Sequence, residues 1–286
     1  MIEAVQTFSS TDGTVLSYHT TGHGPGVIVI PGALAEAADL AGLAQCLASR
    51  FSVYTLDRRG RGRSGPQGDG YSLTTECDDV LTLQELTGAR VLFGHSFGGL
   101  VALEAARNNR HLRQVVVYEP GVSIAGSVPT GWMTRCQAEL DGHHGLDAFA
   151  TFARGINPET AGKLPRGLFK LILRVAMRTD ERRQKVRLLP AAIREHAAAA
   201  HLDNTYEHYQ QVTAGVLLLR GGRGVTAAGA TRTATTLATV LPCSRVVLLP
   251  RLDHFGPEKE PALVARTLLD HVEYAQDRRA EAHDAA

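Results

Sequence analysis

Short apolar runs alternate with longer amphipathic stretches along most of the chain. Continuous runs rich in Val, Ile and Leu are typical of parallel strands buried on both faces, whereas the longer stretches have helical spacing. The pattern predicts strands at residues 3–8, 15–20, 26–30, 51–56, 90–93, 112–118, 216–219 and 245–249. It predicts helices at residues 35–49, 72–86, 100–108, 226–240 and 257–273. After an N-terminal hairpin, this order predicts an α/β fold with a mostly parallel central sheet flanked by helices.

The alternation is interrupted between residues 122 and 214, which carry several helix-like stretches and no strand pattern. In an open parallel sheet the ligand crevice lies beyond the carboxyl ends of the strands, and this insertion follows such an end. We therefore expect residues 122–214 to form a helical cap (lid) over the crevice, and residues 1–121 and 215–275 to form the core. The polar, alanine-rich residues 276–286 are expected to be a flexible tail.

Composition narrows the classes of function. The 286 residues are 44% hydrophobic, enough for one large core, and a formal net charge of +1 gives no electrostatic reason to expect nucleic acid or a membrane as partner. No apolar run reaches the roughly 18 residues of a membrane span, and the first residues do not resemble a secretory signal. The four cysteines lack metal-like or redox spacing, which predicts buried, reduced thiols and no metal site. We expect a cytoplasmic protein that acts on a small molecule, and these features allow a homodimer.

Gly-His-Ser-Phe-Gly at residues 94–98 is the most specific chemical signal in the chain. Ser96 lies between a predicted buried strand and a predicted helix, where a tight turn needs small neighbours and leaves the hydroxyl exposed. The start of the following helix also stabilises negative charge that develops nearby. Ser96 is therefore a candidate nucleophile.

A serine hydroxyl is a weak nucleophile unless a base takes its proton and a third group fixes the tautomer of that base. His254 is the candidate base, because it alone among the 12 histidines follows a core strand beyond the insertion. Together with the Pro-Gly-Ala loop at residues 31–33 and Asp-Arg-Arg-Gly-Arg-Gly-Arg-Ser at residues 57–64, this order resembles the α/β-hydrolase fold superfamily over about residues 5–272. The resemblance implies a serine hydrolase with a helical cap and no cofactor. It also implies that the arginines of residues 57–64 pair locally rather than bind phosphate.

The third member departs from the usual pattern of the family. Most members place an acid after the strand that corresponds to residues 216–219, but that loop reads R-G-G-R-G-V-T-A-A-G, with Gly224 about where the acid is expected. Asp253 adjoins His254 too closely to orient its ring. Some relatives place the acid one strand earlier, which makes Glu119 the candidate. A salt bridge from Glu119 to a cap arginine and a Ser–His dyad without an acid are the alternatives.

Acyl transfer also requires N–H donors for the oxyanion that forms on the substrate. The backbone N–H groups of Phe97 and Ala33 are the predicted donors, since the family builds this hole from the residue after the nucleophile and from an earlier loop. Leu34, His95 and Trp132 are candidate substrate-binding residues, although His95 and Trp132 also fit packing roles.

Basic side chains recur at four-residue steps within residues 165–187 of the cap: Arg166, Lys170, Arg174, Arg178 and Arg182. In one continuous helix they would share a face. A solvated face is the favoured interpretation, and recognition of an anionic substrate is the alternative.

The order of nucleophile, oxyanion loop and base predicts a hydrolase that cleaves an ester, thioester or lactone, or a C–C bond, of a small organic substrate. Epoxide hydrolase and haloalkane dehalogenase chemistry would need a carboxylate at position 96, so both are disfavoured. A non-hydrolytic enzyme on this scaffold (a cyclase, lyase, acyltransferase or cofactor-free haloperoxidase) and a binding protein with a residual site are the alternatives, because the same fold hosts many functions.

Overall fold

The central sheet is the frame on which the rest of the chain is arranged. In the computed structural model, residues 4–284 are described, with side chains for residues 5–272. The sheet has eight strands in the order β1-β2-β4-β3-β5-β6-β7-β8. They are β1 (Ala4–Ser9), β2 (Val15–Thr21), β3 (Gly26–Ile30), β4 (Ser52–Asp57), β5 (Val91–His95), β6 (Gln114–Tyr118), β7 (Gly215–Gly221) and β8 (Ser244–Leu249). β1 and β2 are antiparallel, and β3 to β8 run parallel, which confirms the predicted fold class.

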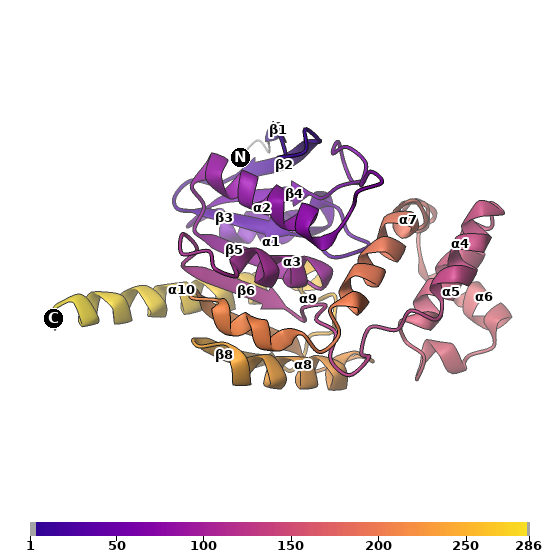
Figure 1. Cartoon of the computed structure of the whole chain (residues 1–286). Coiled ribbons are helices and arrows are strands. Elements are labelled where there is room, and N and C mark those ends of the chain that lie inside the picture. Colours follow the sequence, from indigo (N-terminus) through magenta and orange to yellow (C-terminus); the bar gives the residue numbers. More distant parts are fainter. Residues whose placement is uncertain (1–3, 285–286) are drawn as a thin grey trace.

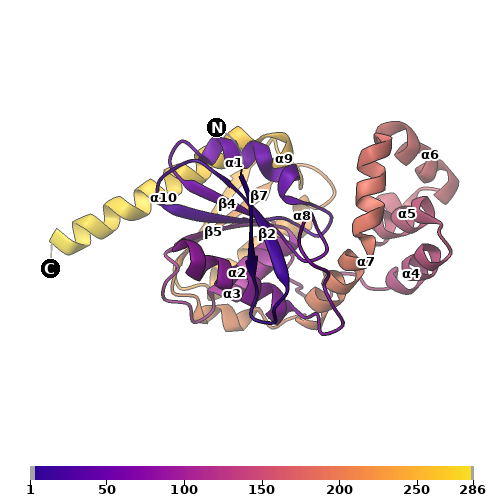
Figure 2. The ribbon, with the colours of Figure 1, turned by 90° about the horizontal axis from the view of Figure 1, so that it is seen from above.

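Helices cover both faces of the sheet (Figures 1 and 2). On one face the apolar cluster includes α2 (Leu73–Thr87), α3 (Phe97–Ala106) and α8 (Ala227–Val240). On the other face it includes α1 (Ala41–Leu47) and α10 (Pro261–Asp284), with the short α9 (Gly256–Lys259) just before α10. Neighbouring side chains of one strand point to opposite faces, so Leu92 joins the first cluster while Val91 and Phe93 join the second.

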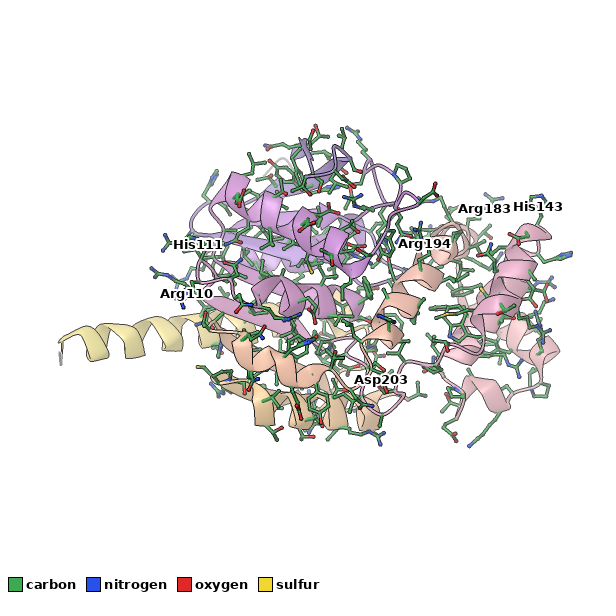
Figure 3. All side chains as sticks on the ribbon, viewed as in Figure 1. Arg110, His111, His143, Arg183, Arg194 and Asp203 are labelled. Atoms are coloured by element: carbon green, nitrogen blue, oxygen red, sulfur yellow. The ribbon has the colours of Figure 1, made fainter. Side chains whose placement is uncertain are left out.

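The chain between β6 and β7 forms a group of helices beside the core. They are α4 (Met133–Asp141), α5 (Gly145–Gly155), η2 (Ala161–Lys163), α6 (Arg166–Ala176), α7 (Thr179–His201) and η3 (Tyr206–Gln211). α4, α5 and α6 lie farthest from the sheet, and α7 runs back to pack on α2 and α3. Figure 3 shows Arg183 at the outer part of α7 and Arg194 where α7 approaches the core. The cap boundaries at residues 122 and 214 stay a prediction.

Two predicted helices differ from the observed ones. The helix expected at residues 35–49 is a 3-10 turn, η1 (Ala37–Leu40), followed by the shorter α1. The closing helix continues past residue 273, so the expected flexible tail is helical up to Asp284. Its Ala, Glu, Gln and Arg residues have high helix propensity, whereas the prediction of a flexible tail was based on its polar composition. The rest of that tail, residues 285–286, lies outside the described residues.

The basic segment of the cap is also not one helix. α6 ends at Ala176, Met177 and Arg178 are extended, and α7 begins at Thr179, so the five predicted cations do not share a face. Lys170 Nζ binds Asp147 at 2.8 Å, and Arg166 Nη2 binds both Asp147 at 3.0 Å and Glu139 at 2.6 Å. The exposed side chains of α6 include Arg174 but are largely apolar: Leu168, Leu171, Ile172 and Val175.

The cysteines match their prediction only in part. All four are free, and Cys136 is buried, but Cys46 and Cys77 are half-buried and Cys243 is exposed. Cys243 lies in the turn between α8 and β8, where the chain reverses at the surface. Within residues 4–284, no helix has both the length and the apolar character that crossing a membrane would require.

Candidate active site

Ser96 occupies a strained turn between β5 and α3. Its backbone angles are φ 53° and ψ −119°, a region that non-glycine residues rarely adopt. The turn is possible because its neighbours are glycines: a Cβ on Gly94 would lie 2.3 Å from the Gly98 carbonyl oxygen, and one on Gly98 would lie 2.2 Å from that of Ile30. The sequence therefore forces Ser96 to the carboxyl end of the sheet.

The turn is held against the strand next to it. The Ser96 N–H donates to the Tyr118 carbonyl at 3.0 Å, and the Ser96 carbonyl accepts from the Gly121 N–H at 2.8 Å. The same carbonyl accepts from the Gly99 N–H at 2.9 Å. With backbone bonds on both sides the strained conformation is over-determined, which is the condition under which such strain persists.

His254 and Glu119 meet across the carboxyl ends of β8 and β6. His254 Nδ1 lies 2.8 Å from Glu119 Oε2, in a pair whose side chains are 26% and 3% exposed. A carboxylate can only accept this hydrogen bond, so Nδ1 carries the proton and the other ring nitrogen, Nε2, is free to accept one. Glu119 has a positive φ of 43° where β6 ends.

Glu119 is fixed by two further donors. Its Oε1 accepts from the Gly221 N–H at 2.9 Å, and its Oε2 accepts from the Thr226 hydroxyl at 3.1 Å. Among the described residues, Glu119 forms no ion pair with an arginine of the cap, which was the alternative role for this carboxylate. The last residue of β7 and the loop after it, which lacks an acid, thus supply the hydrogen-bond donors that hold a carboxylate from the end of β6. Asp253 turns to other partners, namely the Phe255 N–H at 2.9 Å and Lys259 Nζ at 2.8 Å.

The loop that carries His254 is anchored by two side chains that sequence reasoning missed in this role. Tyr118 Oη donates to the Asp253 carbonyl at 2.7 Å, and His95 Nε2 donates to the His254 carbonyl at 2.8 Å. Burial, with a smaller contribution from nearby His254, lowers the pKa of His95 from 6.5 to about 3. His95 is therefore neutral at ordinary pH and ties its strand, one residue before Ser96, to the His254 loop. In the sequence, the position of His95 next to Ser96 was the one sign of this anchoring role.

The predicted oxyanion donors lie on two neighbouring segments. Phe97 is the first residue of α3, so its N–H has no partner within the helix. The loop after β3 passes close to the serine, because a Cβ on Gly32 would lie 3.3 Å from Ser96 Cβ. Among the described residues, the Ala33 N–H donates no hydrogen bond to a backbone carbonyl. Both predicted donors are thus free of backbone partners.

The candidate substrate-binding residues are placed differently from one another. Leu34 is half-buried and packs with Ala33 against the apolar cluster of the cap. Trp132 belongs to that cluster, is 5% exposed and donates from Nε1 to the Pro129 carbonyl at 2.8 Å. His95 is buried beneath the His254 loop. Their role toward substrate stays a prediction.

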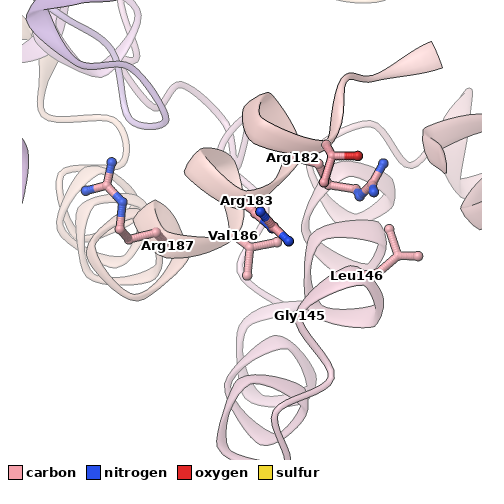
Figure 4. A pocket seen from close by; sticks show the side chains of 7 residues that line it. Gly145, Leu146, Arg182, Arg183, Val186 and Arg187 are labelled. Carbon is pink, nitrogen blue, oxygen red and sulfur yellow. The ribbon is translucent and has the colours of Figure 1, made fainter. Parts of the chain in front are cut away.

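A hollow of about 460 Å³ lies within the cap rather than over Ser96 (Figure 4). Residues of α5 and of the first half of α7 line it, including Arg182, Arg183 and Arg187. Arg182 is one of the cations named for recognition of an anionic substrate, but Ser96, Glu119 and His254 do not line this hollow.

One predicted contact is not formed. Among the described residues, Ser96 Oγ and the His254 ring make no hydrogen bond. Without substrate such a contact is often long or poorly aligned, and it tightens when substrate binds.

Comparisons with known proteins bear on the family and the fold of the chain. A model of the Alpha/beta hydrolase family matches residues 27–267. An uncharacterized hydrolase, YraK, of Bacillus subtilis (strain 168) is 33% identical over 112 residues, which are 38% of this chain and 41% of the relative. The match therefore spans less than half the length of this curated relative.

Solved structures extend the likeness over nearly the whole chain. An alpha/beta hydrolase from Sphaerobacter thermophilus DSM 20745 has a TM-score of 0.76 and 27% identity, covering 91% of this chain and 99% of that chain. The esterase RhEst1 from Rhodococcus sp. ECU1013 has a TM-score of 0.67 and 19% identity, covering 94% of this chain and 98% of its own. At 19% identity the second likeness shows the fold alone.

Proposed function

The chain belongs to the α/β hydrolase family, and we propose that it is a serine hydrolase that cleaves an ester, thioester or lactone, or a C–C bond, of a small organic molecule. In this proposal Ser96 is the nucleophile, His254 the general base, and Glu119 the acid that orients His254. The N–H groups of Phe97 and Ala33 form the oxyanion hole. Residues 122–214 act as the cap that limits access to Ser96.

A single observation carries the proposal: the 2.8 Å contact between His254 Nδ1 and Glu119 Oε2, formed beside a serine in a strained turn. A buried carboxylate on Nδ1 fixes the imidazole in the tautomer that can accept a proton at Nε2. A salt bridge that only stabilised the fold would not need its imidazole to follow a core strand at the same edge of the sheet as Ser96.

The proposed reaction proceeds in two steps. Ser96 Oγ attacks the acyl carbon, its proton passes to His254 Nε2, and the negative oxygen of the tetrahedral intermediate accepts hydrogen bonds from Phe97 and Ala33. The leaving group takes the proton from His254 and departs. Water then attacks the acylated serine, gives its proton to His254, and the acid product leaves as Ser96 Oγ regains that proton. The scheme requires no cofactor.

The proposal also places the enzyme in the cytoplasm. Four free cysteines suit a reducing compartment. Serine at position 96 also separates this chain from relatives whose nucleophile is a carboxylate.

A fluorophosphonate probe tests the proposed nucleophile. We expect covalent labelling of Ser96 in the wild type, located by mass spectrometry of the digested protein. The Ser96→Ala variant should not react, and His254→Ala should react far more slowly, because no base takes the hydroxyl proton. Asp253→Asn is the matched control, since it changes the residue beside His254 and should keep the labelling rate. Folded wild-type protein that remains unlabelled would contradict the proposal.

Product analysis then identifies the bond. A small panel of esters, thioesters, lactones and β-diketones, with products measured by mass spectrometry, separates hydrolysis from acyl transfer. Release of a free acid that depends on Ser96 supports a hydrolase. Transfer of the acyl group to an added alcohol, with no acid formed, favours an acyltransferase instead.

A further inference from the structure

Cationic side chains hold every backbone carbonyl of the loop after β3, from residue 31 to residue 35. Arg58 donates from Nε to Pro31 at 2.9 Å and from Nη2 to Gly32 at 2.8 Å. Arg61 donates from Nη2 to Ala33 and from Nε to Ala35 at 3.1 Å. Lys185 Nζ, from α7, donates to Leu34 at 2.8 Å. This is the loop that carries the Ala33 N–H.

These contacts fix the direction of the N–H groups of the loop. A peptide unit is planar and trans, so its N–H points opposite to its carbonyl. When Arg58 binds the Gly32 carbonyl, it therefore sets the orientation of the Ala33 N–H in the same peptide unit. Arg58 also lies over the ring of Phe97, with its Cζ 5.0 Å from the ring centroid. One guanidinium thus contacts both segments that supply the proposed oxyanion donors.

The two arginines are themselves held by a carboxylate of the cap. Glu195 of α7 accepts at Oε1 from Arg61 Nη2 at 2.6 Å and from Arg58 Nη1 at 3.1 Å, and at Oε2 from Arg58 Nη2 at 3.2 Å. Glu76 of α2 adds a contact to Arg58 Nη1 at 2.8 Å. All four side chains are 0% exposed.

This cluster has two arginines and two glutamates, but the two arginines do not have the same number of carboxylate partners. Arg58 keeps Glu76 if Glu195 is lost, whereas Arg61 has Glu195 as its one carboxylate partner among the described residues. Burial and the nearby Arg58 lower the pKa of Arg61, and Glu195 opposes this effect. Loss of the Glu195 charge would leave two buried guanidinium groups facing one carboxylate, which is strongly unfavourable.

We propose that Glu195 is a positioning residue of the oxyanion hole: it holds Arg58, which binds the Gly32 carbonyl, and Arg61, which binds the Ala33 carbonyl of the next peptide unit, and so makes the cap helix α7 keep the Ala33 N–H in its working direction. This inference rests on the proposed function. It assigns the cap a part in stabilising the transition state as well as in covering the site. Arg194 lies one residue earlier on α7, and its Cζ is 5.0 Å from the ring centroid of Tyr71, so the helix is anchored to the core at this point (Figure 3).

The test separates transition-state stabilisation from substrate binding. In Glu195→Gln we expect kcat to fall about 10-fold to 100-fold, below the loss of about 10²- to 10³-fold known for removal of a whole donor, with KM changed less than about twofold. A boronic acid inhibitor, which forms a tetrahedral adduct on the serine, should bind more weakly by about the same factor as kcat falls. A purely structural role would lower thermal stability without moving the ratio of inhibitor affinity to KM.

Two further variants keep the test decisive. Arg61→Gln combined with Glu195→Gln removes one buried charge of each sign, so the fold should survive even if the single variant does not fold, and kcat should still fall. Glu139→Gln is the matched control, because it removes a cap carboxylate that binds Arg135 and Arg166 far from the loop. It should leave kcat and the inhibitor ratio unchanged.

Four outcomes would overturn the inference. They are a folded Glu195 variant with wild-type kcat, a rise in KM without a fall in kcat, an equal fall in Glu139→Gln, or an inhibitor ratio that does not move. Wild-type protein without turnover that depends on Ser96 would instead refute the proposed function, and the inference with it. The two failures are therefore distinguishable.

Discussion

Replacing Glu119 by glutamine should abolish nearly all turnover, although the two side chains have the same shape and the same number of heavy atoms. The Gly221 N–H, 2.9 Å from Oε1, can face only an acceptor, so the amide oxygen of the new side chain must stay there. Its NH2 group then faces His254 Nδ1, which has to accept and moves its proton to Nε2. That tautomer cannot take the proton of Ser96. The equivalent change in known triads lowers kcat about 10⁴-fold, which is about 5.5 kcal/mol of transition-state stabilisation.

The assay compares kcat for an activated ester in the wild type, Glu119→Gln and two controls, with melting temperatures measured in parallel. Thr226→Val removes only the second donor to Oε2 and should cost about tenfold or less, as expected for one hydrogen bond. Asp253→Asn should stay within a few-fold of the wild type, because its side chain binds Phe255 and Lys259 instead. A folded Glu119→Gln protein with kcat within tenfold of the wild type would remove Glu119 from the mechanism and leave a dyad.

Three further results are expected. His95 has a pKa of about 3 in the folded chain and about 6.5 in the unfolded chain, so acid lowers the free energy of unfolding between these two pH values. In His95→Gln the free energy of unfolding, measured with denaturant at several pH values, should change with pH less steeply than in the wild type, by up to about 1.4 kcal/mol per pH unit. An unchanged dependence on pH would contradict this. Gly98→Ala, whose Cβ would lie 2.2 Å from the Ile30 oxygen, should lose about 1–3 kcal/mol or more in the free energy of unfolding, whereas Gly229→Ala, with open space around it, should not; equal losses would argue against the close packing. Native protein should react with a maleimide at exposed Cys243 but not at Cys136, where burial raises the pKa to about 12; rapid labelling of both would refute the packing of the cap.

Most of the fold of the core could be predicted from local patterns in the sequence. Unbroken Val, Ile and Leu runs predict buried parallel strands because both of their faces must be covered, and β3 is found at the predicted residues 26–30. The glycines around Ser96 likewise predict a tight turn from local sterics. Glu119 could be nominated because its strand neighbours that of Ser96, and the structure brings it to His254.

Ion pairs between residues far apart in the chain could not be predicted from the sequence. Arg61 and Glu195 are 134 positions apart and carry no local mark of their contact, since a buried ion pair reads as two ordinary charged residues. The break between α6 and α7 was also missed, because Arg, Met and Thr at the junction do not stop a helix by propensity alone. The roles of the predicted site residues toward substrate remain predictions for the experiments above.

The carboxylate that meets His254 comes from the end of β6, while the last residue of β7 contributes only an N–H and the loop after it only a hydroxyl. The ends of adjacent strands can therefore supply the same carboxylate, so the strand that usually carries an acid is a poor guide to which residues cooperate. The order Ser96, Glu119 and His254 along the chain is the usual one, so only a search for an acid after β7 would miss Glu119, whereas a spatial template of the three groups would find it. The loop at residues 222–225 needs no acid of its own, but it must still pack on the segment before His254, because a Cβ on Gly222 would lie 2.7 Å from Pro250 Cα.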